Sequence, residues 1–442
     1  MTDVMILTDG RYGQTEPKVD APRLKKIING RLIRDHEIID NDVLYICNGK
    51  ILNPQDCFFS SGKLPNEIID AEGLLIAPGF IDIQINGAFG VDFSEWREED
   101  HIKNGLDKVS KGLLNYGCTS FLPTLISSKP ELYHKVLPLI KPRKGNINQG
   151  AEILGAHLEG PFIASNQYGA HDLLNVRTAP NGFSDFVDMY GLSCSSEGND
   201  ENQNIKLITV APDVEGVLDS IKQLIKIGIT VSIVAQAEEA IKRGANCITH
   251  LFNAMQQFHH RDPGIIGMLG TNYPRPYYGI ICDGIHVHPN SIKIAYDSHP
   301  RGAILITDAM EAMGLPPGDY TLGDVPVRKS GKKVEVIENG KLAGSVLTMD
   351  ECVRNFKKFT GCSIVEAIEA ATLHPAELLG IDNVKGTLYP GADADLVFLD
   401  DDLRIVKCFI AGIEPAEDAL QKRNSIWDIK NNWAPNNYDG GV

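Results

Sequence analysis

The sequence of 442 residues lacks any apolar run of the roughly 18 residues needed to cross a bilayer. Its opening letters, MTDVMILTDGRYGQ, lack the basic start and the apolar core of a signal peptide. The nucleotide-binding fingerprints G-x-G-x-x-G and G-x-x-x-x-G-K-[ST] are both absent. Three scattered tryptophans are too few for an aromatic cage or a nucleic-acid platform. We therefore expect a protein that neither spans a membrane nor binds nucleic acid.

Positive charge is also scarce, since 42 lysines and arginines stand against 58 aspartates and glutamates, for a net charge of −16. Such a chain is poorly suited to nucleic acid or to an anionic membrane, where basic side chains must neutralise phosphates. A small anionic substrate is still allowed, because it needs only a few well-placed cations. The nine cysteines are odd in number and none has C-x-x-C spacing, so we expect reduced thiols and a cytoplasmic location.

Short apolar strands alternate with helical stretches through the middle of the chain. Eight such alternations are typical of a (β/α)8 TIM-type barrel, whereas the rival doubly wound open sheet normally has fewer strands. Strand-rich text at both ends predicts a small β-sandwich domain built from both ends of the chain. The barrel strands are predicted at GFIDIQI (79–85), CTSFLPT (118–124), EILGAHLE (152–159), IKLITVAP (205–212), GITVSIV (228–234), NCITH (246–250), YYGIICD (277–283) and GAILITD (302–308).

The predicted α/β organisation has five parts. They are a disordered tail (1–24), a first β-sandwich segment (25–78), the barrel (79–384), a second β-sandwich segment (385–415) and a C-terminal tail (416–442). Within the barrel, the polar insert 193–204 is expected to be a mobile loop. The stretch 363–380 is expected to be a helix, with a capping box at Ser363 and Glu366 and a stop at Gly380.

Polar residues end four of the predicted strands, at the face of the barrel where catalytic groups stand. They are Glu159 in HLEGPF, His250 in THLFNAM, Asp283 in DGIHVH and Asp308 in ITDAM. Glutamate and histidine are zinc-type ligands, and a separate aspartate can transfer protons. A purely structural role is the alternative for each residue, but four such ends in one barrel favour a functional site.

Longer motifs extend over nearly the whole chain, from Lys25 to about Ile413: PGFIDIQINGAFGVDF, HLEGPF, GAHDLLNVR, APD, THLFNAM, FHHRDPGI, DGIHVHP, TDAM, LAGS and KGTLYPGADADLV. With these motifs the chain resembles the N-acetylglucosamine-6-phosphate deacetylases of the amidohydrolase superfamily. The resemblance implies metal-dependent hydrolysis of the acetamide of N-acetyl-D-glucosamine 6-phosphate to D-glucosamine 6-phosphate and acetate, in amino-sugar catabolism. It also implies one divalent metal ion, most simply zinc, and a homodimer.

The resemblance implies roles for individual residues as well. Glu159 and His250 match metal ligands, and Asp308 matches the catalytic acid/base. Arg261 matches a phosphate contact, for which its planar cationic fork is suited; the alternative is an exposed arginine paired with Asp262 or another neighbour. Members of this family supply some of these contacts across the dimer interface. The remaining matches are to substrate contacts, namely Ala170, His171, Asn253, Ala254, Asp283, Gly284, Ile285, His286, Leu342, Ala343 and Gly344.

Two departures from the family pattern bear on the metal. The His-x-His pair that many amidohydrolases carry on strand one is replaced by amides within Asp82–Asn86, so a second metal is not expected. The Gly-His-Ser or Gly-His-Thr turn of strand five, whose histidine is the third metal ligand, is missing, because no histidine occurs from Ile229 to Thr249. The strand GITVSI also abuts the helix AQAEEAIKRGA, as an in-frame deletion or an alternative splice form would produce.

The missing third protein ligand leads us to expect weak metal binding and slow hydrolysis, because catalytic zinc commonly has three protein ligands and a water. An alternative is a catalytically dead barrel that still binds the sugar phosphate through Asn253, Arg261 and His286. A further alternative keeps the enzyme and changes the substrate to N-acetylgalactosamine 6-phosphate, since one hydroxyl contact can decide between the two sugars.

Overall fold

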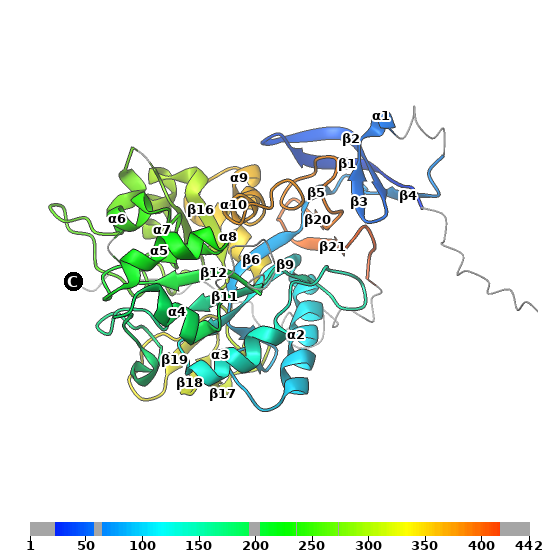
Figure 1. The fold of residues 1–442 in the computed structure, drawn as a ribbon. Helices are drawn as coiled ribbons and strands as arrows, with labels where there is room; N and C mark the ends of the chain where they lie inside the picture. The colour runs from blue at the N-terminus through cyan, green and yellow to red at the C-terminus, as the bar shows by residue number, and fades with distance from the viewer. Residues whose placement is uncertain (1–22, 57–63, 194–203, 236, 273, 416–442) are drawn as a thin grey trace, which may run out of the picture.

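The computed structural model describes residues 23–56, 64–193, 204–235, 237–272 and 274–415 (Figure 1). The predicted C-terminal tail lies outside these ranges, and so do nearly all of the predicted N-terminal tail and of the insert 193–204. No helix among the described residues is long and apolar enough to cross a membrane.

Eight parallel strands form the predicted barrel, which is confirmed. The chain after β16 returns to β6, because the Asp308 N–H donates to Gln84 O at 2.9 Å and Ile85 forms a parallel bridge with Ala309. Every strand candidate is present, the third being split into β10 (Glu152–Ile153) and β11. In order of pairing, the strands are β6 (Phe80–Ile85), β9 (Cys118–Ile126), β11 (Ala156–Glu159), β12 (Ile205–Val210), β13 (Thr230–Ile233), β14 (Cys247–Ile248), β15 (Tyr277–Ile281) and β16 (Ala303–Ile306).

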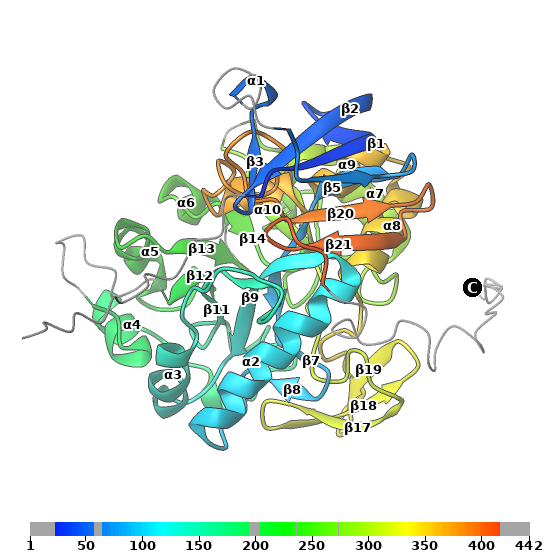
Figure 2. The same cartoon turned by 90° about the vertical axis from the view of Figure 1, so that its right-hand side faces the viewer.

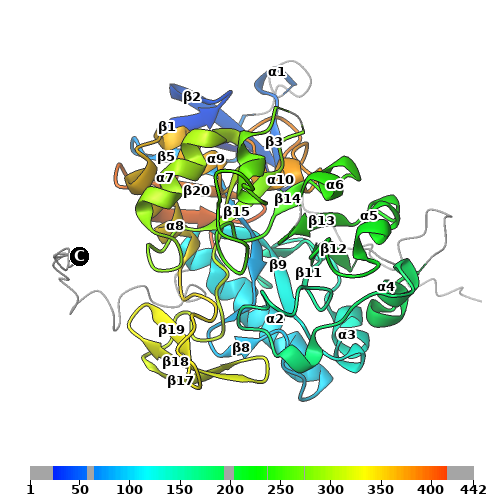
Figure 3. The same cartoon turned by 90° about the vertical axis from the view of Figure 1, so that its left-hand side faces the viewer.

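Helices surround the barrel, as Figures 2 and 3 show from two sides. The strands β6 and β16 are buried at every position, as expected for parallel strands covered on both faces. The longest helix, α2, buries Ile102, Leu106, Val109 and Leu113, which share one face at helical spacing. The helices are α2 (Glu99–Leu113), α3 (Pro130–Val136), α4 (Phe183–Tyr190), α5 (Val217–Lys226), α6 (Ala237–Lys242), α7 (Pro289–Ser298), α8 (Met349–Thr360), α9 (Ile364–Glu369) and α10 (Leu373–Leu378), besides the short α1 (Pro54–Asp56).

The helix expected over 363–380 is broken in two. The capping box is present, since the Ser363 hydroxyl accepts from the Glu366 N–H while the Glu366 carboxylate accepts from the Ser363 N–H. The chain then leaves α9 at Glu369 and enters α10 at Leu373. Pro375 explains the break, because proline has no N–H to continue the helical ladder and its ring crowds the preceding turn. Gly380 follows α10 at a φ of 65°.

Both ends of the chain contribute to one small sheet with its own apolar core, as predicted. The order is β21-β20-β5-β1-β2-β3, with β4 also paired to β1. The β5–β20 pairing is antiparallel and joins the two ends of the chain. The strands are β1 (Lys25–Arg34), β2 (Glu37–Cys47), β3 (Lys50–Leu52), β4 (Glu67–Asp70), β5 (Leu75–Pro78), β20 (Leu396–Leu399) and β21 (Ile405–Phe409).

A buried ion-pair cluster joins this small domain to the barrel. Lys385 Nζ lies 2.7 Å from Glu152 of β10, 2.9 Å from Asp393 and 2.5 Å from Asp395. The Lys385 side chain is 4% exposed. The cluster therefore fixes the start of the second β-segment against the barrel wall.

A three-stranded antiparallel sheet, which the sequence did not predict, lies across the barrel from the small domain (Figure 2). It consists of β17 (Gly318–Leu322), β18 (Val325–Ser330) and β19 (Lys333–Val336), beside the short pair β7 (Gly87–Ala88) and β8 (Val91–Asp92). Leu322, Val327 and Val334 of this sheet pack on Ile126 and Met310 from the ends of barrel strands. The sheet thus covers one side of the face at which the predicted site residues stand.

Candidate active site

The carboxyl ends of the barrel strands surround a polar pocket. Glu159, His250 and Asp308, which follow three separate strands, all meet in it. The lining residues are Asn86, Ile126, Glu159, Gly169, Ala170, His171, His250, Asn253, Ala254, Ile281, His286, Asp308, Leu322, Leu342 and Gly344.

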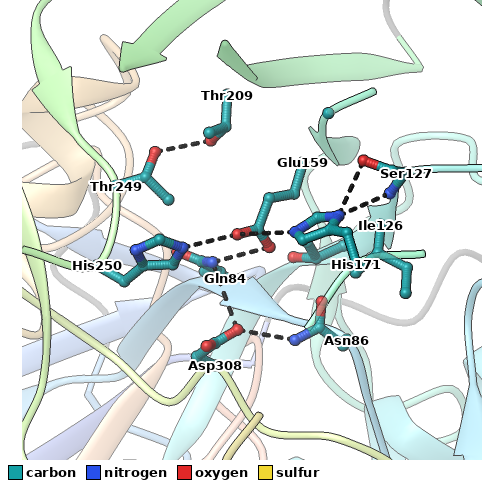
Figure 4. Close-up of polar contacts among 12 residues, drawn as sticks. Gln84, Asn86, Ile126, Ser127, Glu159, His171, Thr209, Thr249, His250 and Asp308 are labelled. Carbon is teal, nitrogen blue, oxygen red and sulfur yellow. Dashed lines mark hydrogen bonds and ion pairs between the residues drawn. The ribbon is translucent and has the colours of Figure 1, made fainter. Parts of the chain in front are cut away.

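Glu159 and His250 form a buried ion pair at the bottom of the site (Figure 4). His250 Nε2 lies 2.8 Å from Glu159 Oε1, and Gln84 Nε2 donates to Glu159 Oε2 at 3.0 Å. Burial alone raises the pKa of Glu159, but hydrogen bonds from His171 and His250 outweigh it and hold that pKa well below its usual range. Burial alone lowers the pKa of His250, but the hydrogen bond to Glu159 and its charge outweigh it and raise the pKa to about 9.

Asp308 faces the same pocket, held by two amides from the end of β6. Asn86 Nδ2 donates to Asp308 Oδ1 at 2.8 Å, and Gln84 Nε2 lies 3.4 Å from the same oxygen. Burial, followed by the nearby charge of Glu159, raises the pKa of Asp308 to about 6. A carboxyl group with a pKa near neutrality can both take up and return a proton, which is what general acid–base catalysis needs.

His171 approaches Glu159 from the side opposite His250 (Figure 4). Its Nδ1 accepts the Ser127 N–H at 3.2 Å and lies 2.8 Å from Ser127 Oγ. Because Nδ1 is an acceptor for a backbone N–H, the proton of a neutral ring sits on Nε2, which lies 3.8 Å from Glu159 Oε1. His171 is thus arranged to donate to Glu159.

Glu159 and His250 are the metal-type donors that touch in this pocket, and His250 Nδ1 is buried without a hydrogen-bond partner. Within the described ranges, one group of three metal-type side chains has its ligand atoms within 4.8 Å of one another, and it lies elsewhere, at Glu152, Asp393 and Asp395. Lys385 contacts all three of those carboxylates, and Lys50 and Lys144 supply two more cations to them, so they are already paired as an ion-pair cluster.

Val234 and Ala235, which directly follow β13, add no metal-type donor to the Glu159–His250 pair. Val234 and Ala235 pack in an apolar cluster with Ile163, Ala164 and Ala211. The expectation that strand five abuts the helix was wrong, since β13 ends at Ile233 and α6 begins at Ala237, a spacing within the 2–6 residues that such connections use.

The loop after β14 places its predicted residues in different surroundings. Asn253 and Ala254 line the pocket, and Asn253 Nδ2 donates to His250 O at 3.2 Å. Arg261 is exposed and stands outside the pocket lining. Its exposure agrees with the alternative, but no ion pair from Arg261 to Asp262 or to another neighbour is found among the described residues. Its backbone N–H donates to His259 Nδ1 at 3.3 Å.

The motif DGIH after β15 forms a turn in which only His286 reaches the pocket. Asp283 lies behind it, with Oδ2 2.6 Å from His286 Nδ1. Gly284 adopts a φ of 74° and Ile285 is exposed, so neither contributes to the lining.

Leu342 and Gly344 line the pocket from the segment after β19, while Ala343 is buried in the apolar cluster beneath the three-stranded sheet. This segment is tied to the acid/base candidate, because the Ser345 N–H donates to Asp308 O at 2.8 Å.

Four residues at or beside this site have strained backbone conformations. His250, Phe252, Ala254 and Asp308 have φ values of 29°, 77°, 49° and 46°, in the left-handed region that residues with a Cβ rarely adopt. Each such conformation costs on the order of 1–3 kcal/mol and persists where surrounding contacts enforce it, typically at functional sites.

Gln84 and Asn86 are polar site residues whose part in the pocket the sequence did not predict. Their alternation with Ile83 and Ile85 places both on one face of β6, which is the signal that would have found them. Leu322 was missed because it belongs to an insert far away in sequence from the strand ends it covers.

Comparison with known proteins gives one consistent answer. The model of the "Amidohydrolase family" matches residues 75–426. An N-acetylglucosamine-6-phosphate deacetylase of Danio rerio is 45% identical over 404 residues, covering 89% of this chain and 96% of its own. An N-acetylgalactosamine-6-phosphate deacetylase of Escherichia coli O157:H7 is 32% identical over 388 residues, covering 86% and 97%. The crystal structure of N-acetylglucosamine-6-phosphate deacetylase from Thermotoga maritima superimposes with a TM-score of 0.71 at 28% identity, covering 88% and 99%. The chain therefore belongs to the amidohydrolase family, as its motifs predicted.

Proposed function

We propose that this protein hydrolyses the acetamide of N-acetyl-D-glucosamine 6-phosphate, releasing acetate and D-glucosamine 6-phosphate. The observation that carries the proposal is a buried aspartate with a pKa of about 6, Asp308, which shares a polar pocket with the Glu159–His250 pair. The names of the relatives agree with it. These names do not favour the alternative of a catalytically dead barrel. They also do not favour N-acetylgalactosamine 6-phosphate as the preferred substrate, because the relative named for that sugar is 32% identical, whereas one named for N-acetylglucosamine 6-phosphate is 45% identical.

The proton chemistry is assigned to Asp308. Asn86 and Gln84 hold Asp308 Oδ1, which orients the carboxylate toward the pocket. We propose that Asp308 takes a proton from the water that attacks the acetamide carbon. When the carbon–nitrogen bond breaks, Asp308 returns this proton to the leaving amine, so that one water is consumed and the carboxylate of Asp308 is regenerated.

The amidohydrolase family implies a divalent metal, and the residues present fit one incompletely. Glu159 and His250 supply two donors, whereas catalytic zinc commonly has three protein ligands. His171 does not complete the set, because its Nδ1 accepts a backbone N–H and its Nε2 faces Glu159. We therefore propose that zinc or a similar ion binds weakly at Glu159 and His250, and that hydrolysis is correspondingly slow.

The sugar phosphate is proposed to contact His171, Asn253, Ala254 and His286 together with the loop 342–344, which all border the pocket. Arg261 stands outside the pocket of its own chain, which agrees with a homodimer in which a second copy receives this residue. Among the described residues, Cys47, Cys118, Cys247, Cys282, Cys352 and Cys362 form no disulfide, in keeping with the reducing cytoplasm that we propose as its location.

Acetate release from N-acetylglucosamine 6-phosphate, measured with and without added zinc, tests the proposal directly. We expect slow turnover that rises with zinc concentration, a low zinc content after dialysis, and a weaker response to the galactose epimer. Calorimetric titration with glucosamine 6-phosphate measures binding separately. Binding of this product without any turnover at saturating zinc would refute the proposed activity and support a binding protein instead.

A further inference from the structure

The turn that carries His286 holds the ring in a defined way. Asp283 Oδ1 accepts the N–H groups of Ile285 and His286, both at 2.8 Å, and its Oδ2 lies 2.6 Å from His286 Nδ1. Gly284 allows the tight turn with its φ of 74°. Both side chains are nearly buried, Asp283 at 5% and His286 at 7% exposed. The carboxylate is therefore fixed by three hydrogen bonds before any ligand binds.

The direction of the third bond follows from the chemistry of its partners. An ionised carboxylate can only accept hydrogen bonds, so the proton between the two groups must sit on His286 Nδ1. Burial raises the pKa of Asp283, but the hydrogen bonds from His286 and from two backbone N–H groups oppose burial and the pKa lies below its usual value, so the carboxylate is ionised. In a neutral ring, Nε2 is then an acceptor. No hydrogen bond from another described residue reaches Nε2, and His286 borders the pocket.

We propose that Asp283 is a positioning residue, which sets His286 Nε2 as a hydrogen-bond acceptor for a hydroxyl group of the bound sugar. An acceptor at this position selects a donor such as a hydroxyl and disfavours a phosphate oxygen, which has no proton to give. This inference rests on the proposed function, because it names which part of the sugar phosphate His286 contacts.

The structure predicts what an amide at this position does. In Asp283→Asn, the two backbone N–H groups keep the carbonyl oxygen at the place of Oδ1, so the NH2 group faces His286 Nδ1. That nitrogen must then accept, which moves the ring proton to Nε2. The pocket would now meet a donor where it had an acceptor, so a sugar hydroxyl would have to accept from Nε2 instead of donating to it, whereas a phosphate oxygen could accept from Nε2 directly.

Nitrogen NMR of the histidine-labelled protein at pH 8 reads the proton position without any need for turnover. We expect His286 to carry its proton on Nδ1 in the wild type and on Nε2 in Asp283→Asn, with Asp400→Asn as the matched control. Asp400 also accepts two backbone N–H groups, from Asp402 and Arg404, but does so in an exposed turn of the small domain. A wild-type ring protonated on Nε2, or on both nitrogens, would overturn the proposal even if Asp283→Asn failed to fold.

Binding measurements test whether His286 contacts a hydroxyl group or the phosphate group of the ligand. We expect Asp283→Asn to weaken binding of glucosamine 6-phosphate by up to about 10-fold, because the sugar hydroxyl must reverse its hydrogen bond with His286, and not to weaken binding of methyl phosphate. An equal loss for both ligands would mean that His286 serves the phosphate and would overturn the hydroxyl assignment.

A double variant separates positioning from a general structural role. If Asp283 acts through His286, Asp283→Asn adds no further loss of sugar-phosphate affinity in a His286→Ala background. A full loss in that background would overturn the proposal. If the protein bound the product but never released acetate, the proposed activity would fail while the NMR and binding results still decided the role of Asp283.

Discussion

Replacing Lys385 with methionine is expected to destabilise the protein strongly, because three carboxylates at the junction of the barrel and the small domain then lose their buried cation. Lys385 Nζ lies within 2.9 Å of Glu152, Asp393 and Asp395, and its side chain is 4% exposed. Burial alone lowers the pKa of Lys385, but the three carboxylates outweigh burial and raise it. The lysine is therefore charged in the folded protein.

The expected loss in the free energy of unfolding follows from the partners that each carboxylate keeps when Lys385 is replaced. Glu152 keeps Lys144 at 3.1 Å, and Asp393 keeps Lys144 and Lys50. Among the described hydrogen bonds, the carboxylate of Asp395 keeps only the one from the Ala411 N–H, at 2.8 Å. Removing one partner of a buried ion pair costs about 3–5 kcal/mol, since the other charge is left uncompensated. We expect a loss of about this size in the free energy of unfolding at pH 7.

The loss should shrink in acid. In the wild type, burial raises the pKa of Asp393, but Lys385 and Lys50 outweigh it and bring the pKa to about 2. An aspartate with a depressed pKa stabilises the fold above its unfolded pKa, near 3.8, and this contribution is lost as the pH falls toward 2. Without Lys385 the buried carboxyl groups take up protons at higher pH, so the variant approaches the wild type as the pH decreases from 7 to 4.

Urea unfolding followed by circular dichroism at pH 7 and pH 4.5 measures both effects. Lys144→Met is the matched control, because Lys144 contacts two of the same carboxylates but its side chain is 68% exposed. Such an exposed pair is worth at most about 1 kcal/mol. If Lys385→Met lay within about 1 kcal/mol of the wild type at pH 7, or if the difference grew in acid, the reasoning from burial would be refuted.

Three further changes test the site and the backbone. Asp308→Asn keeps an oxygen that can accept from Asn86 but cannot carry the proton. We expect kcat to fall about 10²- to 10⁴-fold, while product binding measured by calorimetry persists. Unchanged turnover would remove Asp308 from the mechanism. Glu159→Gln should abolish the zinc response of activity and lower bound zinc, measured by atomic emission; unaltered zinc content would place the metal elsewhere. Gly216→Ala should lower the melting temperature far more than Gly380→Ala. Both glycines have positive φ, but a Cβ at Gly216 would lie 1.7 Å from a backbone oxygen, whereas a Cβ at Gly380 would meet nothing within 4 Å. Equal decreases in melting temperature in a thermal scan would contradict this reasoning.

Apolar runs bounded by glycine and polar residues identified all eight barrel strands, because a parallel strand is buried on both faces and its sequence shows it. The same logic located Glu159, His250 and Asp308, since polar groups directly after such runs stand at one rim. The strand predictions are confirmed because they rested on local sequence, and the three polar residues line one pocket, while their roles stay predictions.

Other features depend on contacts between distant segments. The sheet β17–β19 is short and partly exposed, and its role in covering the pocket follows only from packing against Ile126 and Met310. The exposed position of Arg261 depends on the path of a long loop rather than on its neighbours in sequence. The position of Asp283 behind His286, rather than in the pocket, required the turn geometry at Gly284.

The antiparallel pairing of β5 with β20 has a consequence for biosynthesis. Leu75 pairs with Leu399 and Pro78 with Leu396, so more than three hundred residues must leave the ribosome before that edge of β5 is covered. Until then a nascent chain exposes an apolar strand with open backbone hydrogen-bonding groups, a state prone to aggregation. A premature stop before β20 would leave the edge open permanently, so truncated products should depend on chaperones and be degraded quickly even with every barrel strand intact.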